Sequence, residues 1–95
     1  MFILHVDCVL RPNSRDDLLR VYRDKFMPAI SAQPGYVNTM LLKPLEECAA
    51  EFRLVIAFEN HERQQAWVKT DAHEKVWPEM EASIREYAVH SFETR

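Results

Sequence analysis

The change of hydrophobic periodicity along the chain is the feature that most constrains its fold. The segment FILHVDCVL at residues 2–10 carries no Gly or Pro and is rich in Val, Ile and Leu, which is typical of a strand. Apolar residues then recur every three or four positions from Leu18 to Ile30, which predicts an amphipathic helix. We expect strands at 2–10, 36–42, 51–58 and 85–92, one helix between Ser14 and Gln33, and two more that begin after Asn60 and near Asp71.

This order, β-α-β-β-α-β with the second helical unit split in two, predicts an α+β fold of the ferredoxin-like kind. Its strands form one antiparallel sheet, and its helices cover one face. The 95 residues fit a single domain spanning 1–95. Both faces of the first and third strands are largely apolar, whereas a sheet face in water alternates with polar residues. We therefore expect a homodimer in which the sheet faces opposite the helices meet.

Three polar residues stand where helices should begin. Ser14 precedes Asp17 by three positions, and Asp71 precedes Glu74 by three positions. Asn60 stands just before the helix expected at 60–69. Side chains of these types accept hydrogen bonds from the free N–H groups of a first helical turn, so we expect each of the three to cap a helix.

Proline and glycine predict three local irregularities. Pro28 and Pro78 both lie inside helical patterns, and neither can donate the backbone hydrogen bond of its turn. We expect a kink or a change of helix type near Pro28, and a bend or a restart near Pro78. Gly35 is the only glycine and sits between a helix and a strand, where a positive φ is commonly required.

Composition and motifs exclude several classes of function. The formal net charge is −3 and the basic residues are scattered along the sequence, which argues against binding nucleic acid. A single glycine cannot build a phosphate-binding loop, and there is no metal-binding motif, so no flavin, nucleotide or metal is expected. No apolar run is long enough to span a membrane. The two cysteines, Cys8 and Cys48, form no CxxC pair, which predicts a cytoplasmic protein.

Five residues are the first candidates for chemistry. His5 and Asp7 are two positions apart and project from the same side of the first strand. His73 and Trp77 are four positions apart on one helix face, and Trp67 lies in the preceding helix. If the helices cover the face with His5 and Asp7, these groups would line an aromatic cleft that binds a flat organic ligand.

Each candidate also has an ordinary structural explanation. Both tryptophans can simply fill the core, and His73 can be a histidine satisfied by a backbone or carboxylate partner. His5 and Asp7 can form a hydrogen bond at a sheet edge or an interface. Tyr36, beside the predicted turn, is a further candidate for binding substrate, with packing as the favoured explanation.

The sequence resembles the antibiotic biosynthesis monooxygenase (ABM) family of dimeric α+β barrel proteins across essentially the whole chain. The segments that carry the resemblance are FILHVDCVLRP, FMPAISAQPGYVNTMLL, RLVIAFENHERQQAW and WVKTDAHEKVWPEM. The resemblance implies a homodimer with facing sheets and a small-molecule cleft between sheet and helices in each subunit. Some members of the family oxidise anthrone- or quinol-like substrates with dioxygen and use no flavin, haem or metal. A cofactor-free monooxygenase acting on a small aromatic molecule is the activity it implies here.

The resemblance also implies roles for individual residues. His73 matches the helix histidine common in the family and would accept a proton from the substrate. Trp67 and Trp77 would wall the substrate, and His5 or Asp7 would orient its oxygen atoms. Such chemistry needs an apolar pocket that holds the resulting anion beside dioxygen.

Two alternatives stand beside this interpretation. Haem-degrading relatives have an asparagine where this chain has Asp7, a tryptophan matched by Trp67, and an iron-ligating histidine where this chain has Trp77. Haem degradation is therefore the less favoured branch. A ligand-binding or structural dimeric module without catalysis is the other alternative, because a fold does not select an activity.

Overall fold

The computed structural model describes all residues from Met1 to Arg95 and contains one four-stranded antiparallel sheet with a layer of helices. The strands are β1 (Phe2–Leu10), β2 (Tyr36–Leu42), β3 (Phe52–Phe58) and β4 (Ile84–Glu93). The helices are α1 (Arg15–Val21), the π-helical segment η1 (Tyr22–Phe26), α2 (Met27–Ser31), α3 (His61–Val68) and α4 (Asp71–Glu81). The predicted α+β class and β-α-β-β-α-β order are confirmed.

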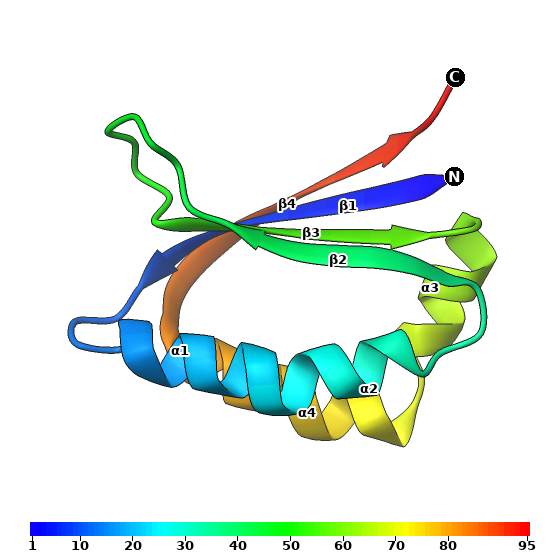
Figure 1. The fold of residues 1–95 in the computed structure, drawn as a ribbon, viewed down its shortest axis with the longest axis horizontal. Helices are drawn as coiled ribbons and strands as arrows, with labels where there is room; N and C mark the ends of the chain where they lie inside the picture. Colours follow the sequence, from blue (N-terminus) through cyan, green and yellow to red (C-terminus); the bar gives the residue numbers. More distant parts are fainter.

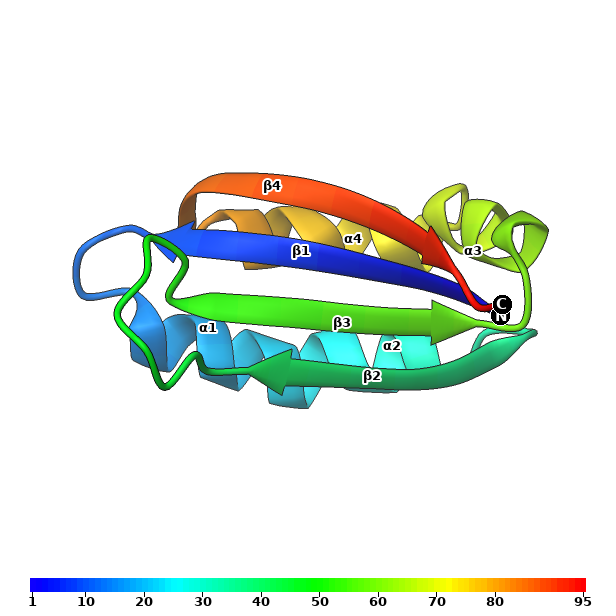
Figure 2. The same cartoon turned by 90° about the horizontal axis from the view of Figure 1, so that it is seen from above.

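The sheet forms one layer and the helices form the other (Figure 1). The strand order is β2-β3-β1-β4, so β1 and β3 are central and β2 and β4 are the edges (Figure 2). The α1–α2 run lies beneath the β2 side of the sheet and α4 lies beneath the β4 side. α3 stands at the end of the sheet where the two chain termini also lie.

Pro28 changes the type of the first helix, as predicted. α1 passes into the π-helical segment η1, and α2 begins at Met27, one residue before the proline. The Met27 N–H donates to the carbonyl of Tyr22, five residues earlier. Because Pro28 has no N–H to donate to the carbonyl of Asp24, a widened turn just before it keeps the neighbouring backbone groups bonded. α4 continues through Pro78 without a restart.

The predicted caps are right at one helix and wrong at two. Asn60 Oδ1 accepts a backbone N–H of the first turn of α3 at 2.9 Å, as expected. Ser14 precedes α1, but its side chain makes no capping bond. α4 is capped by Thr70 instead of Asp71, since Thr70 Oγ1 accepts the His73 N–H at 3.1 Å. Asp71 lies in the first turn, where its negative charge suits the helix dipole.

Gly35 has a φ of +78° in the turn between α2 and β2, which confirms the predicted positive φ. A Cβ atom added there would lie 2.5 Å from Cγ of Arg63. Backbone conformation and the close approach of α3 therefore both require glycine at this position.

Alternation along the strands divides the sheet side chains between two faces. The face toward the helices, here called the helix face, carries the buried hydrophobic side chains of the central strands: Phe2, Val6, Cys8, Leu10, Phe52, Leu54, Ile56 and Phe58. The opposite face, here called the open face, carries the intervening residues: Ile3, His5, Asp7, Val9, Arg53, Val55 and Ala57. The helices therefore do not cover the face that holds His5 and Asp7, and the hypothesis that they do is wrong.

None of the helices has the length and hydrophobicity that crossing a membrane would require. Nowhere in the chain do three or more His, Cys, Asp or Glu side chains gather as metal ligands would. Cys8 and Cys48 are unpaired. Burial in the core raises the pKa of the Cys8 thiol to about 11, so this thiol stays protonated at neutral pH.

Candidate functional site

A pocket of about 170 Å³ opens on the helix face, between the β1–β4 half of the sheet and the helices α3 and α4. Nine of its eleven lining residues are hydrophobic. β1 and β3 supply Leu4, Val6 and Ile56, η1 supplies Phe26, α3 supplies Gln64, Trp67 and Val68, α4 supplies His73 and Trp77, and β4 supplies Tyr87 and Val89.

His73 lies against both tryptophan rings at this pocket. Its imidazole is 5.0 Å from the Trp67 ring, nearly perpendicular to it, and 6.3 Å from the Trp77 ring at an angle of 19°. Trp67 is buried and packs edge-on against Phe26 at 6.2 Å. Trp77 is half-buried and meets Tyr87 edge-on at 5.7 Å. The structure therefore brings His73, Trp67 and Trp77 together at one pocket.

The side chain of Thr70 connects α3 and α4, the two helices that line the pocket, through two hydrogen bonds. Its Oγ1 donates to the carbonyl of Trp67 at 2.7 Å and accepts the N–H of His73 at 3.1 Å. The same hydroxyl thus closes the end of α3 and begins α4. This bridge links the backbones of Trp67 and His73, and their side chains meet on the pocket side.

The imidazole of His73 makes no hydrogen bond within the chain, since only its backbone N–H is bonded. Burial lowers the pKa of His73 below its ordinary 6.5, and the charges of Glu74 and Glu81 oppose this only partly. Asp7, the carboxylate that would have pushed the pKa upward, lies on the other side of the sheet. The imidazole is therefore neutral at pH 7 and able to accept a proton.

Gln64 and Tyr87 also bring polar groups to the pocket, and neither residue was predicted from the sequence. Gln64 is almost fully buried, and its Oε1 accepts from Nε2 of the next glutamine at 3.0 Å, while its own Nε2 donates to no group of the chain. Tyr87 is half-exposed, and its hydroxyl donates to Oε2 of Glu81 at 3.3 Å. Helical spacing places Gln64 three residues before Trp67, a signal that could have identified it. The direction of Tyr87 follows only from the pairing of β4 with β1.

His5 and Asp7 lie on the open face, across the sheet from His73. Arg53 binds the Asp7 carboxylate at two points, Nε to Oδ1 at 2.7 Å and Nη2 to Oδ2 at 3.2 Å. This hydrogen bonding lowers the pKa of Asp7. The His5 ring lies 4.8 Å from the ring of Phe92. The prediction that His5 and Asp7 share a cleft with His73 is wrong, because the even-numbered side chains of β1 face that pocket.

Tyr36 lies at the start of β2, the sheet edge away from β4, and does not line this pocket. Its ring packs edge-on against Phe58 with the centroids 6.2 Å apart. The half-buried ring extends the hydrophobic core at that edge. Packing accounts for the position of Tyr36.

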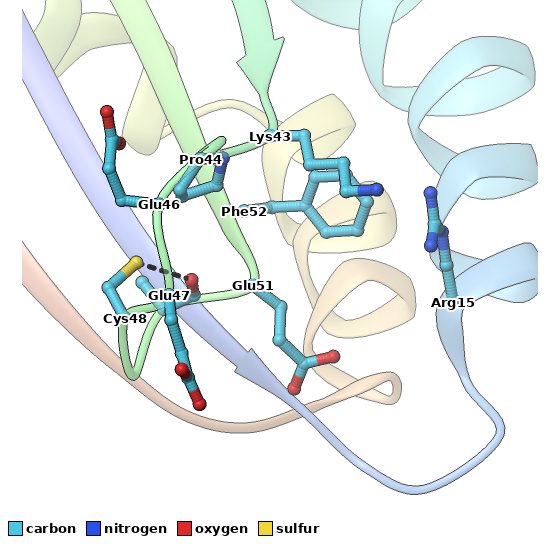
Figure 3. A pocket seen from close by; sticks show the side chains of 9 residues that line it. Arg15, Lys43, Pro44, Glu46, Glu47, Cys48, Glu51 and Phe52 are labelled. Carbon is cyan, nitrogen blue, oxygen red and sulfur yellow. Dashed lines mark hydrogen bonds between the residues drawn. The ribbon is translucent and has the colours of Figure 1, made fainter.

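A second hollow, of about 210 Å³, lies beside the loop that joins β2 to β3 (Figure 3). Only three of its nine lining residues are hydrophobic. The side chains of Arg15 and Lys43 point toward one another near the ring of Phe52, and the Arg15 guanidinium carbon is 5.7 Å from that ring's centroid. Glu51 also lines the hollow. It offers neither the aromatic walls nor the neutral base of the pocket around His73.

No protein-family model and no curated protein matches the sequence, but many solved structures match the fold. One is described as an antibiotic biosynthesis monooxygenase, with 14% identity, a TM-score of 0.82 and coverage of 100% of this chain and 99% of that chain. SnoaB, a cofactor-independent oxygenase from Streptomyces nogalater, has 12% identity, a TM-score of 0.83 and coverage of 99% and 92%. A conserved protein from Methanosarcina mazei Go1 has 9% identity, a TM-score of 0.82 and coverage of 100% and 94%.

The TM-scores establish a shared fold. Because the sequence identities are this low, the activity has to be argued from the site. The likeness covers the whole of the chain and nearly the whole of each neighbour. The protein thus has the fold of solved structures named as antibiotic biosynthesis monooxygenases, which confirms the predicted resemblance at the level of the fold.

Proposed function

We propose that this protein is a cofactor-independent monooxygenase that oxidises a small hydroxylated aromatic molecule, quinol- or anthrone-like, with dioxygen. The observation that carries the proposal is a histidine with a lowered pKa in a pocket walled by two tryptophans. A neutral imidazole can take the substrate's proton, and apolar walls can hold the resulting anion beside dioxygen. The shared fold with SnoaB, a cofactor-independent oxygenase, supports the same kind of chemistry.

For a 1,4-dihydroxybenzene the reaction balances without a further reductant. His73 removes a hydroxyl proton, which makes the ring carbon beside the phenolate electron-rich. That carbon gives electrons to dioxygen and forms a C–O bond, and the imidazolium returns the proton to give a hydroperoxide. Loss of water breaks the O–O and C–H bonds and leaves a carbonyl. The substrate C₆H₆O₂ and O₂ thus give a hydroxybenzoquinone, C₆H₄O₃, and H₂O.

Gln64 would steady the negative charge during this reaction. Its Nε2 is a donor without a partner in the chain, and it belongs to a residue that lines the pocket. A hydrogen bond from such a donor stabilises a developing oxyanion more strongly in a site from which water is excluded. His5 and Asp7 have no part in this scheme, because they lie on the open face.

Oxygen uptake by protein treated with a chelator tests the proposal. With ¹⁸O₂ and a quinol, the expected product carries one ¹⁸O atom, and the second atom appears in water. Uptake no faster than in the absence of protein would contradict the oxygenase, and ring binding without uptake would support the ligand-binding module instead. Formation of hydrogen peroxide with no ¹⁸O in the product would also contradict it.

We also propose a homodimer formed through the open face. Exposed apolar side chains gather there, among them Met40, Leu42 and Phe92. Contiguous apolar surface is seldom left in water, and a second copy would cover it. A stable monomer at micromolar concentration in light scattering would refute the dimer. A cytoplasmic location is supported by the two unpaired cysteines.

A further inference from the structure

We infer that the pocket around His73 accepts one hydroxylated aromatic ring, such as hydroquinone, and excludes fused two-ring and three-ring molecules. This inference rests on the proposed function and narrows its substrate class from quinol- or anthrone-like molecules to quinols with a single ring. It concerns binding, so it can be tested without turnover.

The volume of the pocket sets the size of its occupant. About 170 Å³ is available. An apolar cavity of roughly 150 Å³ holds one benzene molecule, whereas drug-sized ligands occupy pockets of about 300 Å³ or more. One ring with its hydroxyl groups therefore fills the space. A second fused ring enters only if a wall moves or if it stays outside.

The inner walls of the pocket belong to the packed core. Val6, Phe26 and Ile56 are buried members of the main hydrophobic cluster. Trp67 is buried as well, and its edge-on contact with Phe26 at 6.2 Å places it against the same core. Close-packed interiors resist the insertion of extra volume, so these walls do not open for a larger ring.

The outer side of the pocket is exposed. Val68, Tyr87 and Val89 are 38%, 44% and 49% exposed. A ring beyond the first would lie over these side chains with one face in water. It would gain little from burial, because the hydrophobic contribution scales with the apolar area removed from water.

The polar groups of the pocket match the hydroxyl of a single ring. His73 is the acceptor and Nε2 of Gln64 is the donor. No buried side-chain nitrogen or oxygen in the chain lacks a partner, so the unbonded Nε2 of Gln64 is not sealed in the core but keeps some access. The Tyr87 hydroxyl is already engaged with Glu81. A phenol that loses its proton to His73 can then accept from Gln64.

Isothermal titration calorimetry without oxygen compares hydroquinone, 1,4-dihydroxynaphthalene and 1,8-dihydroxyanthrone. Hydroquinone is expected to bind once per subunit and at least tenfold more tightly than either larger molecule. Gln64→Leu is expected to weaken hydroquinone about tenfold and to leave benzene binding unchanged, because benzene has no oxygen for Gln64 to bind.

A pair of valine variants locates the size limit. Val89→Ala widens the pocket at its exposed side and is expected to raise the affinity for dihydroxynaphthalene at least fivefold relative to hydroquinone. Val37→Ala is the matched control, since Val37 is 46% exposed on the other edge strand and outside the pocket. It should change neither affinity.

Equal or tighter one-to-one binding of a fused-ring molecule by the unmodified protein would overturn the inference, as would identical behaviour of the two valine variants. If hydroquinone binds in the expected order and no dioxygen is consumed, the size limit holds and the oxygenase proposal fails. If a three-ring molecule is bound and oxidised, the oxygenase proposal holds and the size limit fails.

Discussion

The two faces of the sheet treat ionisable side chains in opposite ways. On the open face, Asp7 is held charged by a two-point bond from Arg53, and water reaches both partners. Across the sheet, in the pocket between the helix face and α4, the ring of His73 has no hydrogen-bonding partner, and burial favours its neutral form. The open face therefore stabilises charge that is already present, whereas the helix face holds a base that is ready to take up a proton.

Core packing should give the largest difference between the faces. Phe26→Ala removes a fully buried ring beneath the pocket and is expected to lower the free energy of unfolding by about 3–5 kcal/mol. Phe92→Ala removes a half-exposed ring on the open face and should cost less than about 1 kcal/mol. Urea unfolding compares them, at a dilution at which light scattering reports monomers. Similar losses would mean that the faces are not packed as described.

The second largest expected difference between the two faces is in kcat/KM, when His73 and His5 are each replaced by alanine. His73→Ala is expected to lower kcat/KM for a quinol by about a hundredfold or more, because a general base contributes roughly 10² to 10⁴. His5→Ala is the matched change on the open face and should stay within about twofold. Oxygen uptake measures both, with circular dichroism to verify folding. An equal loss in the two variants would contradict the assignment of the base to the helix face.

The smallest expected effect is the dependence of stability on pH, which differs between the faces. The pKa of His73 is lowered from 6.5, so in acid the unfolded chain binds a proton before the folded chain does. Stability is therefore lost as pH falls below about 6.5, and His73→Gln should remove this loss. The pKa of Asp7 is lowered from 3.8, so its contribution is present above that value and lost below it. Asp7→Asn should remove only the loss of stability at the lower pH. Midpoints of urea unfolding, measured as a function of pH for both variants, test these two expectations.

Much of the fold can be predicted from local signals. The Val, Ile and Leu content of residues 2–10 fixed the first strand, Pro28 marked the change of helix type, and Gly35 marked the turn that needs a positive φ. Capping was less predictable, because Thr70 and Asp71 are adjacent and both are good capping residues. Thr70 occupies the N-cap position of α4, where its hydroxyl also donates to the carbonyl of Trp67.

The candidate site was harder to predict because it depends on which face the helices cover. Alternation showed that His5 and Asp7 share a face, but β1 is apolar on both sides, so its pattern did not say which side meets the helices. Helical spacing did place His73 and Trp77 together. Gln64 was missed although it stands three residues before Trp67, because the rest of α3 is mostly polar and this spacing indicates only a shared helix face and not a pocket.

The crystal structure of the protein with hydroquinone, prepared without oxygen, tests most directly whether the pocket on the helix face is the aromatic-binding site. We predict one ring lying against Trp67 and Trp77, with a hydroxyl oxygen about 2.7–3.2 Å from a nitrogen of His73. A ring bound beside His5 on the open face or in the charged hollow near Arg15, with the pocket around His73 left empty, would contradict the account.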